Sequence, residues 1–217
     1  MIQFQNVSLK LGDRQILDQF NLTVSTGEKV VLTAPSGSGK TSLLKLILGF
    51  IDADQGMIRF GDKEVKSGNM QLIRSQIGYL SQDIDFPNGR VAEVFPEIFS
   101  YYANRHIPYS TRLLANKLRE VNLPIGTLQK NTSDISGGER QRLGWILIML
   151  LDRPVLLLDE PTSALDEKQK EFFIRYVVNT DKTVICASHD PEWQLPGIRI
   201  IPGFPAEDDL LHNRMLA

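Results

Sequence analysis

Residues 34–41 read APSGSGKT, which has the spacing of a loop that binds phosphate groups. The usual pattern is a glycine, four residues, glycine–lysine and then serine or threonine, and only its first position departs here, with Ala34 in place of glycine. We expect alanine to be tolerated if its φ angle is negative, because this position turns the chain rather than touching phosphate closely. The alternative is a glycine-rich turn without a ligand, which leaves the lysine–threonine pair unexplained.

A loop of this kind would present several polar groups to a nucleotide. Gly37 and Gly39 let the backbone curl so that N–H groups point inward, and the following helix adds a partial positive charge at its N-terminus. Lys40 would reach the β- and γ-phosphates, and the hydroxyl of Thr41 would ligate Mg²⁺. The residues that we expect to bind the nucleotide in this segment are Pro35, Ser36, Gly37, Ser38, Gly39, Lys40, Thr41 and Ser42.

A second segment whose side chains could take part in catalysis is VLLLDE, residues 155–160. Four apolar residues predict a buried strand, and two acids follow at its carboxyl end, where open α/β sheets bind ligands. Asp159 would hold Mg²⁺, through a water molecule, and Glu160 would polarise the attacking water as a general base. The alternative is a surface turn after a strand, since acids often end strands.

The third segment is ISGGERQR, residues 135–142, whose two glycines precede a helical pattern. It looks like another phosphate-binding helix start, although the chain already has a phosphate loop about a hundred residues earlier. Ser136 with Glu139 three residues later also makes a good helix-capping arrangement. Capping does not require two glycines, and both interpretations can hold together.

The elements that must position these segments alternate between strands and helices. We predict strands over Ile2–Leu9, Val30–Thr33, Ile77–Leu80, Val155–Leu158 and Thr183–Ala187, from their apolar and β-branched patterns. Helices are predicted at Leu43, Leu44, Ile47 and Leu48, with Gly49 as a stop, and over Glu167–Val178. Such alternation favours an α/β layered core. Residues from about 91 to 122 are rich in aromatic residues and helix formers, and we expect a small helical lobe there.

The phosphate loop, ISGGERQR and VLLLDEPTSALD together closely resemble the nucleotide-binding subunit of ATP-binding cassette (ABC) proteins. The resemblance extends from Ile2 to about Ile201, and the LSGGQ-like signature is highly specific to this family. Two mild departures are Ile135 in place of leucine and Glu139 in place of glutamine. The resemblance implies an α/β fold: a P-loop NTPase core of the ABC type, with an N-terminal antiparallel β subdomain and a small α-helical subdomain.

The resemblance also implies that two cassettes pack head to tail, with ATP and Mg²⁺ bound between them. We expect the two cassettes to be identical chains that form a homodimer. The signature of one chain would close over the γ-phosphate held by the other, so that Ser136, Gly137, Gly138 and Glu139 serve a nucleotide on the partner. This use in trans would explain why one chain carries two phosphate-binding segments. An isolated monomer should then hydrolyse ATP slowly.

Four further positions acquire roles by the same resemblance. Gln82 matches the Q-loop glutamine, which would sense Mg²⁺ and the attacking water. Asp166 ends SALD, which matches the D-loop between the two sites, and His189 matches the switch histidine that orients water at the γ-phosphate. Leu11 stands where the family usually has an aromatic residue against adenine; leucine keeps apolar contact but loses π-stacking, so that weaker nucleotide binding is expected.

The resemblance implies one ABC ATPase domain over residues 1–217. Residues 1–85 and 126–217 would form the catalytic core lobe, and residues from about 86 to 125 the helical lobe, on which an integral membrane permease subunit would dock. Within that lobe an apolar cluster can serve either as the lobe's own core or as a docking surface. Its members are Phe95, Ile98, Phe99, Tyr101 and Tyr102.

Composition argues against nucleic-acid-binding, membrane-spanning and secreted proteins. The net charge of −2 over 217 residues gives no overall positive field toward nucleic acid, and we expect no nucleic-acid partner. The longest apolar run worth testing, Trp145–Leu151, is far shorter than the ~20 residues of a membrane span. The N-terminus has no signal-peptide pattern, and Cys186 is the only cysteine, which favours a reducing cytoplasm. With the family resemblance, the expected location is peripheral, on the cytoplasmic face of the inner or plasma membrane.

The leading hypothesis is an ATP-hydrolysing subunit that dimerises on ATP and drives a separate membrane permease. The alternative is a soluble ABC ATPase, such as one for iron–sulfur cluster assembly; a regulatory ATP sensor without turnover is disfavoured because Glu160 and His189 are both present. The short lobe, SGGER and TSALDE are similar to iron-export-type cassettes. The cargo and the direction of transport are left open, because cargo specificity would belong to the membrane subunit.

Overall fold

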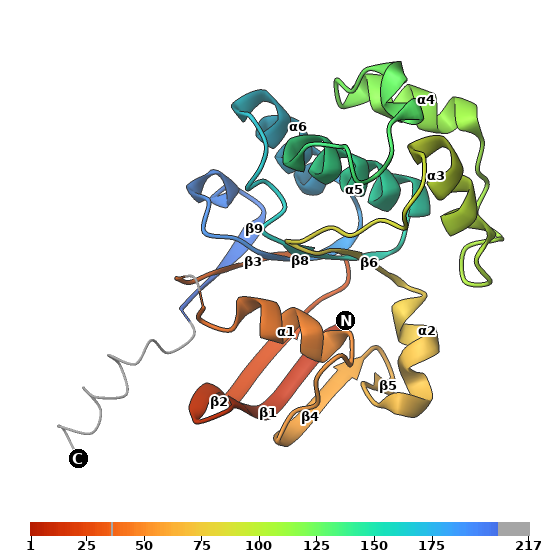
Figure 1. The fold of residues 1–217 in the computed structure, drawn as a ribbon. Helices are drawn as coiled ribbons and strands as arrows, with labels where there is room; N and C mark the ends of the chain where they lie inside the picture. The colour runs from red at the N-terminus through yellow and green to blue at the C-terminus, as the bar shows by residue number, and fades with distance from the viewer. Residues whose placement is uncertain (36, 204–217) are drawn as a thin grey trace, which may run out of the picture.

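Two β-sheets of different kinds lie one above the other with a helix between them in the computed structural model, which describes residues 1–35 and 37–203 (Figure 1). The antiparallel sheet has the order β2-β1-β4-β5, formed by β1 (Ile2–Leu11), β2 (Arg14–Val24), β4 (Gln55–Phe60) and β5 (Lys63–Glu64). The parallel sheet has the order β6-β7-β8-β3-β9, formed by β3 (Lys29–Thr33), β6 (Ile77–Leu80), β7 (Val155–Asp159), β8 (Thr183–Ala187) and β9 (Ile198–Pro202). The α/β fold with an antiparallel β subdomain is therefore confirmed.

The central strands of the parallel sheet are apolar because both of their faces are covered. Every residue of β7 and β8 is buried. On one side of the sheet, α1 (Lys40–Ile47) packs between the two sheets and shares a hydrophobic cluster with Phe4 of β1 and Leu157 of β7. On the other side lie α5 (Gly137–Leu151) and α6 (Glu167–Asn179), whose apolar residues form a second cluster (Figure 1).

The strands and helices predicted from sequence periodicity are confirmed at these places, whereas β2, β4, β5 and β9 carried no signal that was recognised individually. In β1 and β2 the alternation is interrupted by register shifts, and Asn6 and Gln19 have positive φ angles of 48° and 44°. Such bulges break the two-residue period on which strand prediction depends. The short strand β5 makes only two pairs with β4.

The helical region contains α3 (Val91–Ser100), α4 (Thr111–Glu120) and a short turn over Ile125–Gln129, beside α5 (Figure 1). Another helix, α2 (Met70–Arg74), follows the antiparallel sheet. The buried residues of α3 and α4 join the same hydrophobic cluster as α5. The division of the chain at residues 86 and 125 into two lobes stays a prediction.

The apolar run Trp145–Leu151 lies within α5 and belongs to this core: Trp145, Ile146 and Ile148 are buried. In the part of the chain that the structure describes, no helix has both the length and the apolar character that a membrane crossing requires. Residues 204–217 lie outside the described residues.

Stacking of Trp145 on Phe173 joins α5 to α6, with ring centroids 4.5 Å apart and an interplanar angle of 10°. Both rings are fully buried. We expect Phe173→Ala to lower the free energy of unfolding by ~3–5 kcal/mol, because it removes apolar contact and leaves a cavity. Urea denaturation followed by circular dichroism measures this loss. The matched control is Leu72→Ala, at an exposed side chain, with an expected change within ~0.5 kcal/mol; equal losses for the two variants would contradict the packing described here.

Candidate functional site

The carboxyl ends of four parallel strands place the predicted residues along one edge of the sheet. The phosphate loop follows β3, Gln82 follows β6, Asp159 and Glu160 end β7, and His189 follows β8. Parallel pairing aligns these ends, since Asp159 pairs with Ala187 and Leu32 pairs with the same residue of β8. The structure thus brings together side chains that are more than a hundred residues apart in the sequence.

Positive φ angles shape the phosphate loop. Gly37 and Gly39 have φ angles of 78° and 101°, and a Cβ atom on Gly39 would lie 2.3 Å from Cγ2 of Ile16. Glycine is therefore required at position 39 both by conformation and by space. Ala34 is not among the residues with positive φ, so the one departure from the usual pattern introduces no strain. Ser36, predicted to bind nucleotide, lies outside the described residues.

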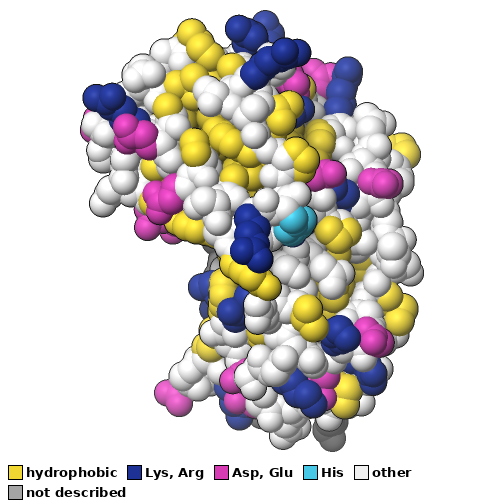
Figure 2. Space-filling view, turned by 90° about the vertical axis from the view of Figure 1, so that its right-hand side faces the viewer, with side chains coloured by type: hydrophobic (Ala, Val, Ile, Leu, Met, Phe, Trp, Pro, Cys, Tyr) yellow, Lys and Arg dark blue, Asp and Glu magenta, His cyan; other side chains and the backbone are white. Residues whose placement is uncertain are grey.

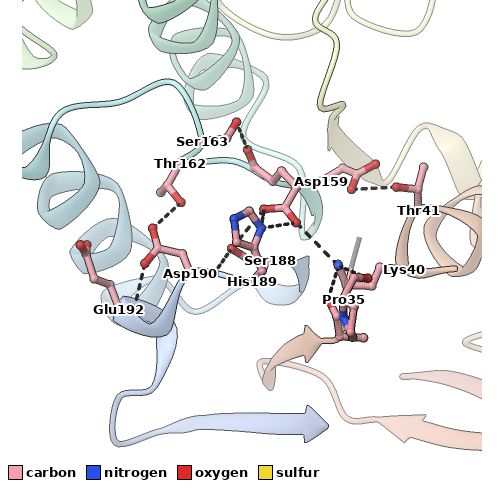
Figure 3. A network of polar contacts seen from close by, with 12 residues as sticks. Pro35, Lys40, Thr41, Asp159, Thr162, Ser163, Ser188, His189, Asp190 and Glu192 are labelled. Atoms are coloured by element: carbon pink, nitrogen blue, oxygen red, sulfur yellow. Dashed lines mark hydrogen bonds and ion pairs between the residues drawn. The ribbon is translucent and has the colours of Figure 1, made fainter. Parts of the chain in front are cut away.

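The lysine of the loop is buried and folds back on the loop itself. Lys40 Nζ donates to the carbonyl oxygens of Ala34 and Pro35, the latter at 3.2 Å, and lies 3.8 Å from Glu160 Oε1 (Figure 3). Its ammonium group is thus held among acceptors at the centre of the loop. The hydroxyl of Ser38 is buried and has no hydrogen-bond partner among residues 1–35 and 37–203, so an acceptor or donor is free for a ligand.

The residues present fit a magnesium ion. Thr41 Oγ1 donates to Asp159 Oδ1 at 3.1 Å, which places a hydroxyl and a carboxylate oxygen side by side at the start of α1. Mg²⁺ in nucleotide sites is held by one or two such oxygens together with phosphate oxygens and water. Burial of Asp159 raises the pKa of its carboxyl, although the Thr41 hydrogen bond and the positive charge of Lys40 oppose the rise. A buried carboxylate with a raised pKa gains most from a bound cation.

The carboxylate of Glu160 lies within hydrogen-bond or ion-pair distance of Lys40, Ser188 and His189. His189 Nδ1 lies 3.0 Å from Glu160 Oε1, and the Ser188 hydroxyl is 3.5 Å from Oε2. The backbone of Glu160 has a left-handed φ angle of 46°, and its N–H donates to the carbonyl of Ala187 at 2.8 Å. The acid and the histidine that the sequence singled out separately are therefore hydrogen-bonded partners.

A further part of this network was missed by the sequence analysis. Asp190 accepts hydrogen bonds from Thr162 at 3.4 Å and from the N–H of Glu192 (Figure 3). Lys170 Nζ also lies 3.1 Å from Asp190 Oδ2. Partial burial alone would raise the pKa of Asp190, but the Glu192 N–H and Lys170 together lower it. The only available signal was that Asp190 directly follows the histidine.

A cavity of about 450 Å³ opens at this edge of the sheet. The predicted residues that line it are Leu11, Gly37, Ser38, Gly39, Lys40, Thr41, Ser42, Gln82, Asp159, Glu160 and His189. Leu11, 46% exposed, contributes to the rim from β1. Arg14 and Ile16 of β2 line the cavity as well, and no motif had pointed to them. Pro35 is not part of the lining and faces Lys40 through its carbonyl.

The signature segment lies outside this cavity. Ser136 caps α5: its hydroxyl accepts from the N–H of Glu139 at 3.3 Å, and the Glu139 carboxylate accepts from the N–H of Ser136 at 3.0 Å. Lys130 donates to the same carboxylate at 2.8 Å and lowers the pKa of Glu139, together with the Ser136 N–H. The capping role of Ser136 and Glu139 is confirmed; their predicted contact with a partner's nucleotide, like that of Gly137 and Gly138, stays a prediction.

The two glycines of the signature differ in what surrounds them. A Cβ atom on Gly137 would meet nothing within 4 Å, whereas one on Gly138 would lie 3.0 Å from the carbonyl oxygen of Ala164. Packing inside this chain therefore accounts for Gly138 and not for Gly137. Asp166 caps α6 by accepting from the N–H of Gln169 at 2.9 Å and does not line the cavity of its own chain. Its predicted place at the nucleotide between two cassettes stays a prediction.

The apolar cluster of the helical region divides in two. Phe95, Ile98 and Phe99 are buried and form core, whereas Tyr101 and Tyr102 are exposed, Tyr102 by 71%. A second cavity, of about 420 Å³, lies beside Tyr102 and Leu72 of α2. In Figure 2, which views this side of the molecule, hydrophobic side chains gather over the upper half, above a hollow in the outline.

Fold and cavity together define an α/β nucleotide-binding protein of the phosphate-loop class. The model of the ABC transporter family matches residues 17–163, about two thirds of the chain. The probable iron export ATP-binding protein FetA of Escherichia coli is 33% identical over 205 residues, which cover 88% of this chain and 86% of FetA. The chain belongs to the ABC transporter family, whose cassettes bind and hydrolyse ATP.

Other relatives are longer proteins or assembled cassettes. The transport/processing ATP-binding protein ComA of Streptococcus pneumoniae is 35% identical over 195 residues, which cover 86% of this chain but 27% of ComA. The solved cassette MJ0796, a dimer in a post-hydrolysis state bound to ADP and Pi, is 26% identical, covers 93% of this chain and 94% of its own, and has a TM-score of 0.78. A bacterial Atm1-family ABC exporter with ATP bound shares the fold, with a TM-score of 0.79 at 20% identity over all of this chain and 42% of its own. These relatives favour a transporter ATPase over an iron–sulfur cluster assembly ATPase.

Replacement of Asp159 and of Asp190 by asparagine should change the melting temperature in opposite directions. Because the pKa of Asp159 is raised in the fold, its ionised form destabilises the protein above the folded pKa, and this penalty is absent below the unfolded value of about 4. Asp159→Asn should therefore raise the melting temperature of the nucleotide-free protein at pH 7 and leave it nearly unchanged at the lowest pH at which the protein stays folded. Thermal unfolding by circular dichroism at both pH values measures this.

The control for this prediction is Asp190→Asn. The lowered pKa of Asp190 means that its carboxylate stabilises the fold above about pH 4, and that this contribution is lost as the pH falls through the folded pKa. Asp190→Asn should therefore lower the melting temperature at pH 7. Destabilisation by both variants at pH 7 would contradict the assigned environment of Asp159.

Proposed function

We propose that two copies of this chain pack head to tail as a homodimer and enclose two ATP molecules, each held by the phosphate loop of one copy and the signature of the other. The observation that carries this proposal is the separation of the two phosphate-binding segments. The cavity of about 450 Å³ holds the phosphate loop but none of Ser136, Gly137 or Gly138. Gly137, whose Cβ position is open, leaves the first turn of α5 accessible to a ligand from outside the chain.

Within each site the residues have distinct roles. Lys40 leaves the carbonyls of Ala34 and Pro35 and neutralises the β- and γ-phosphates. Thr41, Asp159 and Gln82 would hold Mg²⁺, which would supply positive charge to screen the phosphates. Glu160 accepts a proton from the attacking water, and His189, which contacts Glu160 at 3.0 Å, orients the γ-phosphate and that water.

The rim of the cavity receives the base. Leu11 supplies apolar contact to adenine without π-stacking, and Arg14, on the next strand, lies beside the phosphate loop, with its Nη1 3.8 Å from the Cβ position of Gly37. Arg14 thus adds a positive charge that the phosphates of a bound nucleotide meet on entry.

We further propose that the chain works on the cytoplasmic face of a membrane, where a separate permease subunit docks on the helical region. Tyr101 and Tyr102 are both exposed, and Tyr102 lines the cavity of about 420 Å³. They suit such a contact because they present apolar rings with polar tips. FetA is named for probable iron export. For the present chain, we propose that the membrane subunit selects the cargo. We propose no nucleic-acid partner. Closure of the cassette dimer on ATP and its opening after hydrolysis would move the two docked subunits.

The role of Glu160 can be tested by Glu160→Gln, which keeps the size of the side chain and removes its basicity. We expect turnover to fall by a factor of about 10² or more, from the loss of the general base. The variant should form a dimer with ATP–Mg²⁺ that persists and is absent without nucleotide. Phosphate release measures turnover, and light scattering measures the oligomeric state.

The matched control is Lys40→Ala, which removes the phosphate contact and should give neither turnover nor dimer. A monomer of Glu160→Gln under all conditions, even with the permease subunit present, would overturn the head-to-tail site. Undiminished hydrolysis by Glu160→Gln would instead remove Glu160 from the mechanism and leave the dimer unaffected.

The base contact can be tested by Leu11→Tyr. A ring against the base contributes ~1–3 kcal/mol, so ATP affinity should rise by about fivefold or more. Stacking does not distinguish bases, and the affinity for GTP should rise in parallel. Titration with a fluorescent ATP analogue measures the change, and Leu72→Ala serves as a distant control. An unchanged affinity would place the base elsewhere than beside β1.

A further inference from the structure

Helix α5 holds residues 160–164, which follow strand β7, through two side chains that lie one helical turn apart. Gln141 Nε2 donates to the carbonyl oxygen of Glu160 at 3.0 Å, and Gln141 Oε1 accepts from the N–H of Ala164 at 2.8 Å. Trp145 Nε1 donates to the carbonyl oxygen of Pro161 at 2.9 Å. Three hydrogen bonds from one helix therefore fix both ends of residues 160–164.

These contacts occur where the backbone needs support. Glu160 has a left-handed φ angle of 46°, a conformation that costs a non-glycine residue ~1–2 kcal/mol and persists only when its surroundings enforce it. The Glu160 carbonyl accepts from Gln141, and also from the hydroxyl and the N–H of Ser163 at 3.0 and 3.3 Å. Of these donors, only Gln141 belongs to an element outside the segment itself.

Burial separates this contact from direct nucleotide chemistry. Gln141 is 4% exposed and Trp145 is fully buried, and neither lines the cavity of about 450 Å³ that contains the phosphate loop. Both polar atoms of the Gln141 amide are satisfied within the chain. An amide buried in this way is a fixed link, since leaving either of its partners without a hydrogen bond is costly.

We propose that Gln141 is a positioning residue for Glu160, and that it links the signature of each chain to the chain's own catalytic carboxylate. This inference rests on the proposed role of Glu160 as the general base. Gln141 lies one turn after Gly137 in α5, and the backbone at Gly138 packs directly against Ala164, where a Cβ atom would lie 3.0 Å from the carbonyl oxygen. A displacement of the first turn of α5 by a nucleotide on the partner chain is therefore transmitted to Glu160 by a rigid helical turn and one amide.

The test compares variants of Gln141 in the full-length chain. Gln141→Leu removes both hydrogen bonds at nearly constant volume, and Gln141→Glu keeps the acceptor for Ala164 but loses the donor to Glu160. A displacement of the carboxylate by an ångström lowers turnover by a factor of up to ~10². We expect both variants to lower kcat by about 10-fold or more, while the KM for ATP stays within about twofold, because the phosphate loop is untouched.

Two controls separate positioning from loss of structure. Gln169→Leu removes another buried amide, on α6, whose Oε1 has no hydrogen-bond partner in the described part of the chain, and it should retain kcat within about twofold. Trp145→Phe keeps the ring and removes the donor to Pro161, and it should lower kcat less than Gln141→Leu does. Circular dichroism of each variant verifies that it is folded.

A second measurement does not depend on turnover. In the Glu160→Gln background, Gln141→Leu should leave the ATP concentration for half-maximal dimerisation unchanged within about twofold, because positioning of Glu160 affects hydrolysis and not binding. The inference is overturned if Gln141→Leu retains kcat, or if kcat falls together with a matching rise in KM and weaker dimerisation. Should Glu160→Gln itself hydrolyse ATP normally, the proposed role of Glu160 as the general base fails first, whatever the Gln141 variants do.

Discussion

Parallel pairing of β3, β7 and β8 is the constraint on which the rest of the structure depends. It brings the carboxyl ends of three strands from distant parts of the chain to one edge, so that Leu32 and Asp159 both pair with Ala187. The loops that follow these strand ends therefore lie next to one another. Lys40, Glu160 and His189 come within hydrogen-bonding or ion-pair distance because the strands before them are in register.

The strands themselves can pair in this way because both faces of the sheet are covered. Helix α1 fills the space toward the antiparallel sheet, and α5 and α6 cover the opposite face. Helix α5 makes contacts along much of its length. Its first turn carries the signature, its middle holds residues 160–164 through Gln141 and Trp145, and Arg140 donates to the carbonyls of Ile84 and Thr132. Gly144 faces Ile84, which leaves room for the segment after Gln82 to pass close to the helix.

Charge within the site is balanced before any nucleotide arrives. The ammonium of Lys40 is surrounded by two carbonyl oxygens and the carboxylate of Glu160, and Glu160 in turn faces His189 (Figure 3). Under the proposed function, a phosphate group that enters the loop would replace these acceptors around Lys40 and free Glu160 from that ion pair. Binding of nucleotide would then also release the proposed base, a coupling that requires the phosphate loop and the end of β7 to share one cavity.

The sequence by itself determined the local chemistry: the glycines of the phosphate loop, the acids at the end of an apolar strand, the capping pair Ser136 and Glu139, and the periodicity of the main strands and helices. These features can be predicted from the sequence because each depends on residues that are only a few positions apart. Tertiary structure alone decided that β3 lies between β8 and β9, that Arg14 and Ile16 line the cavity, that Asp190 supports the histidine loop, and that Gln141 holds Glu160. The physical reason is that hydrogen bonds between residues far apart in the chain leave no period in the sequence, and the partner of a glutamine in a helix is set only when the helix packs.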